Sequence, residues 1–515
     1  MYKDKLFCAA VMLANVSKAF AGGILTNTNQ NIAFNRSMAR DGVVAIDGVY
    51  SNPAGVAFMD KGLHLSFNIQ SAFQTRTINS GIETELPAPF NTPFVMNGGN
   101  ENGIKKFEGE ASAPIVPSIQ AALVKDRWSF QGSFAVVGGG GKCTFNHGLG
   151  SFERTISLLP AVLAQTQDAY KDLIVLESDT PGYSVSSYMK GKQFVYGLQL
   201  GATYKVLDHL AVYGGLRFNY IFNKYEGNIK DICANIGGQD ENLYNYLGLK
   251  ANELSGMAAY LNAQAMTCET EEEAEIYRTK AAQIQAGANA MSGVQGQLKD
   301  RYLDCTQTGW SICPIIGIDY NNGPLNIGAR LEFTTHFNIQ NNTKVDDTGM
   351  FADGVNTPGD MPGLFTIGAQ YSILPSLRVL GGFHYFFDKD AHMDNDKQKL
   401  LDYNTWEYNA GAEYDITKDI MVSAGFQKTN YGLGDGAFLT DMSFVTSSYS
   451  IGFGGSVRLS DKVKLNVAYF WTDYSTKHKE YEETYSAAGQ SITAKCTDDF
   501  TRTNKVFGVG VDVDF

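Results

Sequence analysis

The side chains that could act as nucleophiles, general bases or metal ligands are scattered along this sequence. No His-Glu-x-x-His zinc motif is present, and no Gly-x-Ser-x-Gly element marks a serine nucleophile. The P-loop and dinucleotide fingerprints are also missing. We therefore predict no enzyme activity and no cofactor. The seven histidines are His64, His147, His209, His336, His384, His392 and His478.

Carboxylates cluster in two segments, where oxygen ligands at short spacing could bind Ca²⁺. Neither segment fits the twelve-position Ca²⁺ loop, so the spacing favours solvated acidic loops, and we predict no metal site. The clusters are Asp346, Asp347, Asp353 and Asp360, and Asp388, Asp390, Asp394 and Asp396.

The N-terminus predicts export from the cytoplasm. Two lysines precede the apolar stretch 6–14, and the small-x-small pattern of Ala19 and Ala21 follows, so residues 1–21 are predicted to be a signal peptide. Six cysteines remain after its removal, and fifteen pairings are open to them. Cys233 and Cys305 bracket a long insertion, and a disulfide between them would close its base.

The composition excludes several classes of protein. Charged residues make up 18% of the 515-residue chain, below the ~25% of soluble domains, and 54 residues are glycine. The formal net charge of −13 argues against a nucleic-acid partner. Beyond the N-terminus no run of about 18 apolar residues could form a transmembrane helix.

Apolar and polar side chains alternate from residue 62 onward, which is the pattern of β-strands. At the end of the chain, for example, Phe507, Val509 and Val511 share one face, while glycine and aspartate occupy the other. Fourteen strands are predicted near 62–73, 116–124, 128–138, 193–206, 210–225, 309–320, 325–340, 363–373, 377–388, 403–416, 419–431, 444–459, 463–474 and 503–515.

The connections between these strands alternate between short and long. Six are tight, at 125–127, 207–209, 321–324, 374–376, 417–418 and 460–462. A set of soluble β-sandwiches would not require this alternation, whereas an outer-membrane barrel has short turns at one rim and long loops at the other. We therefore predict an all-β fold, a 14-stranded antiparallel transmembrane β-barrel over 62–515, with its long loops outside the cell.

Two segments do not fit the barrel wall. Residues 228–305 have helical spacing and are predicted to form an outer-loop insertion. A second helical segment, near 152–176, carries the apolar residues Leu158, Leu159, Val162 and Leu163. These side chains could capture apolar ligands, or they could pack against other loops as a cap.

Residues 22–61 precede the first strand and lack its alternation, so they could form either a periplasmic tail or a plug. Asn-Ile-Ala-Phe-Asn-Arg-Ser-Met-Ala-Arg at 31–40 and Ile-Asp-Gly-Val-Tyr-Ser-Asn-Pro-Ala-Gly at 46–55 resemble the N-terminal hatch of the FadL/TodX family of outer-membrane hydrophobic-compound transporters. The resemblance implies that 22–61 plug the barrel and that Asn52, Pro53, Ala54 and Gly55 belong to the gating hatch.

The family resemblance also implies an inward kink in the third strand, where the wall opens sideways in some members. The corresponding strand here contains Gly138, Gly139, Gly140 and Gly141. Glycines permit such a kink, but they could equally form an ordinary flexible strand end.

The predicted function is passive, hatch-gated uptake of hydrophobic small molecules, such as long-chain fatty acids or aromatic compounds, by a monomer in the bacterial outer membrane. The partners of such a channel are its hydrophobic ligand and the outer-membrane lipid. The alternative is a general porin, or a surface adhesion barrel whose helical outer loop binds a partner.

Overall fold

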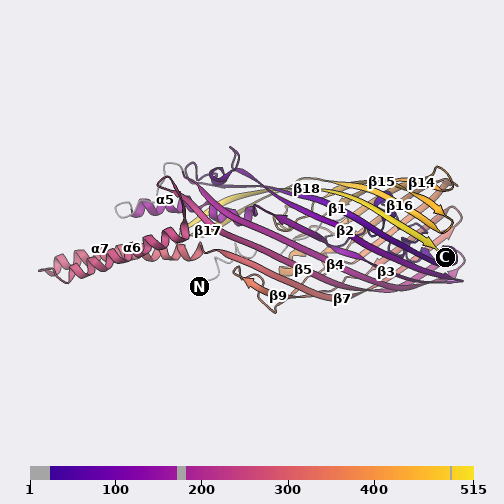
Figure 1. Ribbon diagram of the computed structural model, residues 1–515, viewed down its shortest axis with the longest axis horizontal. Helices are drawn as coiled ribbons and strands as arrows, with labels where there is room; N and C mark the ends of the chain where they lie inside the picture. The colour runs from indigo at the N-terminus through magenta and orange to yellow at the C-terminus, as the bar shows by residue number, and fades with distance from the viewer. Residues whose placement is uncertain (1–23, 171–180, 488–489) are drawn as a thin grey trace.

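The computed structural model describes residues 24–170, 181–487 and 490–515. The predicted signal peptide lies outside these residues. The described chain forms one antiparallel sheet that closes on itself, because β1 pairs with β18 from His64 and Asp514 to Thr84 and Ala494. Figure 1 shows the strands running obliquely along a single long barrel.

The wall consists of fourteen strands, as the sequence predicted. Eighteen segments make up the sheet, but β6 is a short hairpin arm on β5, and three wall strands are each divided into two segments: β8 with β9, β10 with β11, and β16 with β17. The segments are β1 (Gly62–Thr84), β2 (Ile104–Lys125), β3 (Trp128–Phe145), β4 (Tyr183–Leu207), β5 (Leu210–Ile236), β6 (Gln239–Asn242), β7 (Arg301–Asn322), β8 (Leu325–Glu332), β9 (Asn338–Asp346), β10 (Asn356–Pro358), β11 (Leu364–Leu374), β12 (Leu377–Phe386), β13 (Trp406–Asp415), β14 (Ile420–Asn430), β15 (Ser448–Ser460), β16 (Val463–Tyr474), β17 (Lys477–Ala487) and β18 (Gln490–Asp514).

The two ends of the barrel differ. The predicted tight turns and the C-terminus lie at one end, and the long connections with helices α5, α6 and α7 lie at the other (Figure 1). We call these the turn end and the loop end.

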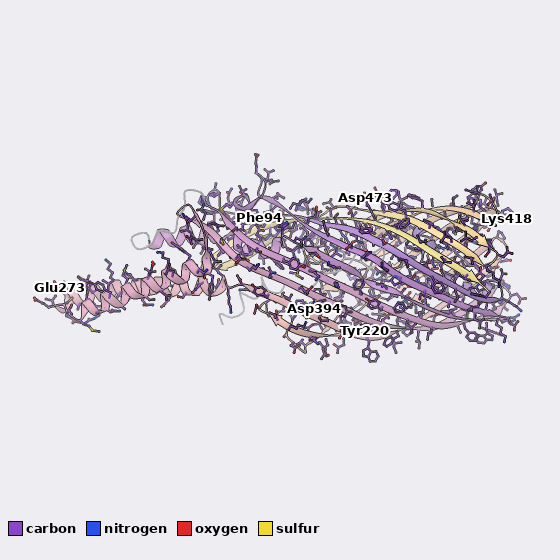
Figure 2. All side chains as sticks on the ribbon, viewed as in Figure 1. Phe94, Tyr220, Glu273, Asp394, Lys418 and Asp473 are labelled. Carbon is purple, nitrogen blue, oxygen red and sulfur yellow. The ribbon has the colours of Figure 1, made fainter. Side chains whose placement is uncertain are left out.

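The two faces of the wall follow the alternation in the sequence. On β1, Phe67, Ile69 and Phe73 point outward and are 47–55% exposed, while Ser66 and Asn68 point inward and are buried. Large apolar residues repeat this outward exposure around the barrel, as Tyr220 does in Figure 2. None of the described helices is long and apolar enough to cross a membrane.

Among the described residues, four helices of eight residues or more lie at the loop end: α4 (Gly150–Ser157), α5 (Leu159–Tyr170), α6 (Leu243–Ala265) and α7 (Glu271–Gln297). The side chains of Asn242 and Thr270 cap α6 and α7 by accepting from backbone amides. These two helices form a hairpin that projects away from the barrel (Figure 1). The insertion predicted at 228–305 therefore has helices only in its central part, because β5 continues to Ile236 and β7 begins at Arg301.

The predicted disulfide between Cys233 and Cys305 is wrong, and both residues are free thiols. Cys305 pairs in register with Tyr225 of β5, and Cys233 lies eight residues further along that strand. At ~3.3 Å per residue this places the two cysteines far beyond the ~7 Å Cα separation that a disulfide tolerates. The pairing was predicted because both cysteines lie near the ends of the insertion in sequence. Both β5 and β7 extend well past their predicted bounds, which separates the two residues.

Candidate functional site

The N-terminal segment 24–61, which we call the hatch, lies inside the barrel against its inner wall. It contains the short helices α2 (Ile32–Ser37) and α3 (Gly48–Ser51) and the 3₁₀ turn η2 (Gly55–Phe58). The side chain of Asn31 caps α2 by accepting from the Ala33 amide at 2.7 Å. The hatch backbone therefore has local structure of its own, although its helices are too short to be stable alone.

One carboxylate of the wall holds two arginines of the hatch. Glu413 of β13 accepts from Arg36 at 2.8 Å and from Arg40 at 2.7 Å, and both arginines are buried. Arg40 also pairs with Asp47 of the hatch at 2.7 Å, and Arg378 of β12 donates to Glu413 at 3.2 Å. A buried guanidinium is stable only when it is paired in this way, so this cluster fixes the first half of the hatch to the wall.

A second ionic group holds the middle of the hatch. His384 of β12 lies between Asp41 of the hatch and Glu407 of β13, at 2.9 Å from each. Arg330 of β8 stacks on the ring of Tyr50, with 4.3 Å to the ring centroid. His384 and Glu407 lie on the same two strands as Arg378 and Glu413, and Arg330 adds a contact from β8, so the hatch is anchored at several points.

The predicted gating element, residues 52–55, is a further anchor. Asn52 donates to Asp319 of β7 at 2.6 Å, and the Pro53 carbonyl accepts from Gln131 of β3 and Thr203 of β4 at 2.8 and 2.7 Å. Ala54 packs against Tyr213, Cys313 and Ile315. A Cβ on Gly55 would lie 2.3 Å from the side-chain nitrogen Nδ2 of Asn52, which its hydrogen bond to Asp319 holds in place, so glycine fits best there.

Wall glycines allow the hatch backbone to approach this closely. A Cβ at any of them would lie 2.2–2.8 Å from hatch atoms such as the Ser37, Asn35 and Asp41 backbone oxygens. These glycines pair in register, Gly328 with Gly368 and Gly411 with Gly425, which in turn pairs with Gly452. Part of the glycine excess in the composition thus belongs to the hatch interface. We call Gly328, Gly368, Gly411, Gly425 and Gly452 the glycine belt.

The ladder between β2 and β3 is interrupted next to the hatch. Pairing stops between Ser112 and Ser118 of β2, and resumes on β3 only outside 136–141. There β3 turns to the hatch instead: the Asn27 amide donates to Val137 at 2.9 Å and the Gly139 amide donates to Leu25 at 3.0 Å. Since β3 continues to Phe145, the four glycines lie within the strand, at the point where its ladder to β2 is interrupted. Gly139 and Gly141 have φ of 91° and 71°, where glycine is favoured.

The interruption leaves a crevice between the wall and the hatch. Asn27, Asn29 and Gln30 line it from the hatch, and Val116 and Val136 line it from the two strand edges. Val116 and Val136 also pack with Met38 of the hatch. We call the unpaired stretch of β2 and β3 the wall gap.

On the loop-end side of the hatch, a large cluster of buried apolar side chains fills part of the interior. Strand residues and the loop between β14 and β15 form this cluster together, and such packing excludes water. We call this cluster the apolar compartment. It consists of Ile24, Ile78, Ala111, Cys143, Phe145, Leu149, Phe152, Met189, Tyr225, Leu303, Cys305, Phe351, Leu401, Tyr431, Leu433, Phe438, Leu439, Met442, Phe444, Val445 and Phe500.

Lys397 lies buried beside this compartment, with its Nζ 4.7 Å from the centroid of the Phe438 ring. Burial, with the nearby charge of Lys479, lowers the pKa of Lys397 to about 7. The unfolded chain keeps this proton up to about pH 10.5, so stability should rise between pH 7 and pH 10.5. We expect Lys397→Met to raise the melting temperature at pH 6.5, by the equivalent of a few kcal/mol. The variant should also show a smaller increase of stability between pH 7 and pH 10.5.

Thermal unfolding of the detergent-solubilised protein at pH 6.5 and pH 9 measures this effect. Lys399→Met is the matched control, because Lys399 is 69% exposed and pairs with Asp396 at the surface. Equal pH dependence in the wild type and Lys397→Met would contradict the assignment.

The predicted capture residues do not form an exposed surface. Leu158 packs with Phe94 and Phe107, while Leu159 and Leu163 pack with the base of the α6–α7 hairpin. All four, including Val162, are at most 7% exposed. They act as the core of a cap over the loop end, which is the second of the two interpretations that the sequence left open.

Aspartates of the two acidic segments accept hydrogen bonds from backbone amides. Asp360 accepts from the Phe337 and His392 amides, and Asp388 accepts from the Ile24 and Thr405 amides. Within residues 24–170, 181–487 and 490–515, no group of three or more His, Cys, Asp or Glu side chains could hold a metal ion.

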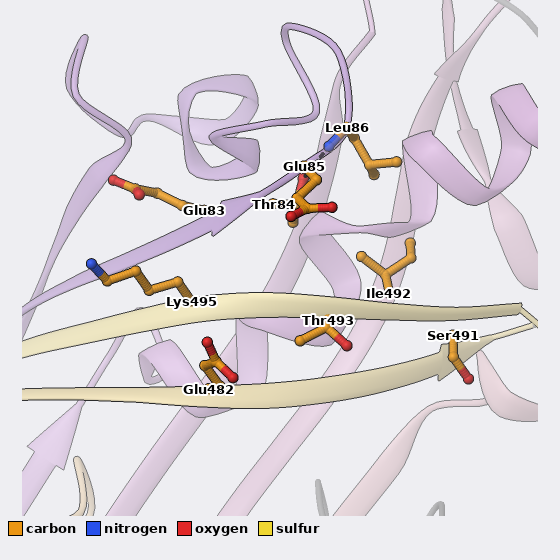
Figure 3. Close-up of a pocket in the computed structure, with 9 residues that line it drawn as sticks. All are labelled: Glu83, Thr84, Glu85, Leu86, Glu482, Ser491, Ile492, Thr493 and Lys495. Atoms are coloured by element: carbon orange, nitrogen blue, oxygen red, sulfur yellow. Dashed lines mark hydrogen bonds between the residues drawn. The ribbon is translucent and has the colours of Figure 1, made fainter.

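A surface depression at the loop end is lined by Glu83, Glu85, Glu482 and Lys495 (Figure 3), far along the wall from the hatch.

Sequence reasoning did not identify the wall residues that bind the hatch. Glu413, Arg378 and Glu407 lie on the polar faces of predicted strands, which marked them as interior residues. A charged side chain on the inward face is also expected in a water-filled pore, so this pattern did not indicate that these residues contact the hatch. Arg36 and Arg40 were visible in the hatch motif, but Glu413, their shared partner on the wall, lies more than 370 residues away in the chain.

Comparison with known proteins now identifies the fold. No family model matches the sequence, and no curated protein matches it. Among solved structures, a FadL homologue from Pseudomonas aeruginosa aligns with a TM-score of 0.58 and 13% identity, covering 96% of this chain and 100% of that one. The chain has the FadL fold.

A second FadL-fold structure supports this assignment. The deltaS2S3 mutant of TodX, described as a monoaromatic hydrocarbon channel, aligns with a TM-score of 0.50 and 11% identity, covering 94% of this chain and 99% of that one. The fold predicted from the hatch motif and the strand count is therefore confirmed, and it extends over nearly the whole chain.

Proposed function

We propose that this chain is an outer-membrane channel for hydrophobic small molecules, which diffuse through it when the hatch shifts. The outward apolar residues of the wall support a location in lipid, since they form a band that water would not stabilise. The names of the FadL homologue and the hydrocarbon channel with the same fold support a hydrophobic cargo.

One observation carries the proposal: the wall gap lies directly beside the hatch and on the turn-end side of the apolar compartment. A porin needs a continuous aqueous lumen, whereas here the hatch occupies the lumen and an apolar cluster fills part of the space beyond it. A hydrophobic molecule could pass from the apolar compartment to the wall gap without entering water. Movement of the hatch strand at Leu25 and Asn27, which pairs with β3, would open that path.

The decisive experiment measures ligand binding and polar conductance on the same preparation. Delipidated protein should bind a long-chain fatty acid or an aromatic hydrocarbon at an interior site, and should conduct small polar solutes poorly in a planar bilayer. Strong polar conductance without hydrophobic binding would establish the porin alternative instead.

The exit route has its own test at the wall gap. A Cβ on Gly141 would lie 3.6 Å from the Cβ of Ala113, within the range of disulfides. The double variant Ala113→Cys, Gly141→Cys should therefore join the two strand edges when oxidised. We expect oxidation to reduce uptake of a hydrophobic probe into proteoliposomes severalfold, and a reductant to restore it.

Each single cysteine variant is the control, because it places the same thiol without the bond. Equal uptake by the oxidised and reduced double variant, with the disulfide shown by mass spectrometry, would exclude exit through the wall gap.

A further inference from the structure

Four lysines stand together on the outer face of the barrel, towards the loop end. Lys142 of β3 pairs in register with Lys192 of β4, which in turn pairs with Lys224 of β5. Lys190 lies two residues from Lys192 and therefore on the same face of β4. All four are exposed or partly exposed, whereas the next residue along the strand, such as Cys143, is buried. We call these four lysines the basic patch.

The charge of the basic patch is only partly balanced by the protein. Glu226 of β5 pairs with both Lys190 and Lys224. Asp304 of β7 lies 3.9 Å from the Nζ atom of Lys224. The other two lysines of the patch form no ion pair with any residue that the structure describes. Like charges directly opposite each other destabilise a sheet, so three lysines in one register row favour an anion from outside the chain.

The basic patch begins where the outward aromatic residues of the wall end. Phe194 lies two residues from Lys192 on the turn-end side, and Phe222 lies two residues from Lys224 in the same direction. The next outward residue of β5 is Tyr220, which is 40% exposed and is labelled in Figure 2. Aromatic residues concentrate at the boundary between the hydrocarbon core and the lipid head groups. The basic patch therefore lies at the level of the head groups.

This positive charge is confined to one sector of the barrel. On β2, the strand next to β3, the exposed residues towards the loop end include Glu108 and Glu110. On β18, Asp499 is 43% exposed in the corresponding part of the wall. The chain as a whole has a formal net charge of −13. The basic patch is thus a local exception on an acidic protein, and not part of a generally basic surface.

We propose that the basic patch binds the phosphate groups of a lipid in the outer leaflet, a glycolipid with more than one phosphate, whose acyl chains lie along the outward aromatic residues. This inference rests on the proposed function, which places the protein in the outer membrane. Neighbouring strands are ~4.8 Å apart, so the row from Lys142 to Lys224 spans about 10 Å, which suits two phosphates better than one. Charge-assisted hydrogen bonds to phosphate are strong. Because Lys142 directly follows Gly141, the bound lipid would lie beside the wall gap.

The test titrates delipidated protein in a non-ionic detergent with lipid A that carries two phosphates and with its dephosphorylated form, and native mass spectrometry counts the bound lipid. We expect the wild type to bind the phosphorylated form about ten- to hundredfold more tightly. The triple variant Lys142→Gln, Lys192→Gln, Lys224→Gln should lose most of this preference. Lys192→Glu alone should also lose it, because a negative charge then stands at the centre of the row.

The matched control is the triple variant Lys106→Gln, Lys428→Gln, Lys505→Gln. It makes the same change of charge on β2, β14 and β18, where no two of these lysines pair in register. This control should keep the preference of the wild type. Inorganic phosphate at the concentration of the lipid should not displace it, because phosphate alone has no acyl chains to contact the aromatic residues. Displacement would indicate a site for free phosphate and overturn the lipid assignment.

Binding of a hydrophobic ligand inside the barrel, measured on the same variants, separates this inference from the proposed function. The basic patch faces away from the interior, so interior binding should not change in any of them. Equal binding of both lipid A forms by the wild type, a preference retained in the patch variants, or a preference lost equally in the control would overturn the lipid site while leaving hydrophobic uptake intact. If the preference for phosphorylated lipid A holds but no hydrophobic ligand binds inside, the proposed function fails and the lipid site stands.

Discussion

Deleting residues 24–61 is expected to turn the closed barrel into an open pore. The wall does not need the hatch to close, since β1 and β18 pair along their whole shared length. The wall side chains left behind, such as Glu413, Asp319 and His384, are polar and would face water in the emptied lumen. In planar bilayers we expect a steady, ohmic current of small ions through the deletion variant and only brief openings in the full-length protein.

The matched control removes the α6–α7 hairpin, residues 243–298, and joins its ends with a short Gly-Ser linker. The hairpin projects from the loop end (Figure 1) and makes no contribution to the hatch contacts described above, so this deletion should leave the conductance low. Similar low currents from the hatch deletion, with the barrel shown to be folded, would mean that the loop-end cap is the seal and the hatch is not.

The sequence was sufficient to predict the barrel because each strand that faces lipid must alternate. The six tight turns and the fourteen wall strands follow from that alternation alone. The strand ends were not predicted, because the wall continues beyond the apolar band. β1 reaches Thr84, but beyond Phe73 its outward face carries polar side chains, at Thr75, Thr77 and Asn79. Without an apolar face, alternation gives no signal.

The candidate site was predictable only where a local motif carried it. Residues 52–55 form a turn whose sequence resembles other hatches, and the structure places all four against the wall. The ionic anchors could not be predicted, since Arg36 and Glu413 meet only after the barrel closes around the hatch.

Replacing Glu413 by glutamine is expected to release the hatch while leaving the barrel folded. The neutral amide keeps the shape of the side chain, but it leaves Arg36 and Arg40 buried without their shared counter-ion on the wall. Removing one partner of a buried ion pair costs about 3–5 kcal/mol. Most of this penalty is avoided if the hatch leaves its place and the arginines reach water. Hydrogen exchange of the amides in α2 should therefore quicken by about a hundredfold or more, and ion conductance should rise.

Asp415→Asn provides the comparison that isolates this effect. Asp415 lies on the same strand as Glu413, and its replacement by asparagine makes the same change of charge. It pairs with Arg378 at 2.6 Å, but both side chains of this pair are partly exposed, Asp415 at 32% and Arg378 at 19%. Pairs of this kind contribute about 0–1 kcal/mol, and Asp415 contacts no hatch arginine in any described interaction. Exchange in α2 should be close to that of the wild type in this variant. If Glu413→Gln instead lowered the unfolding temperature of the whole barrel and left α2 as protected as before, the ionic cluster would stabilise the wall, and the hatch would be held by the glycine belt and the anchor at residues 52–55.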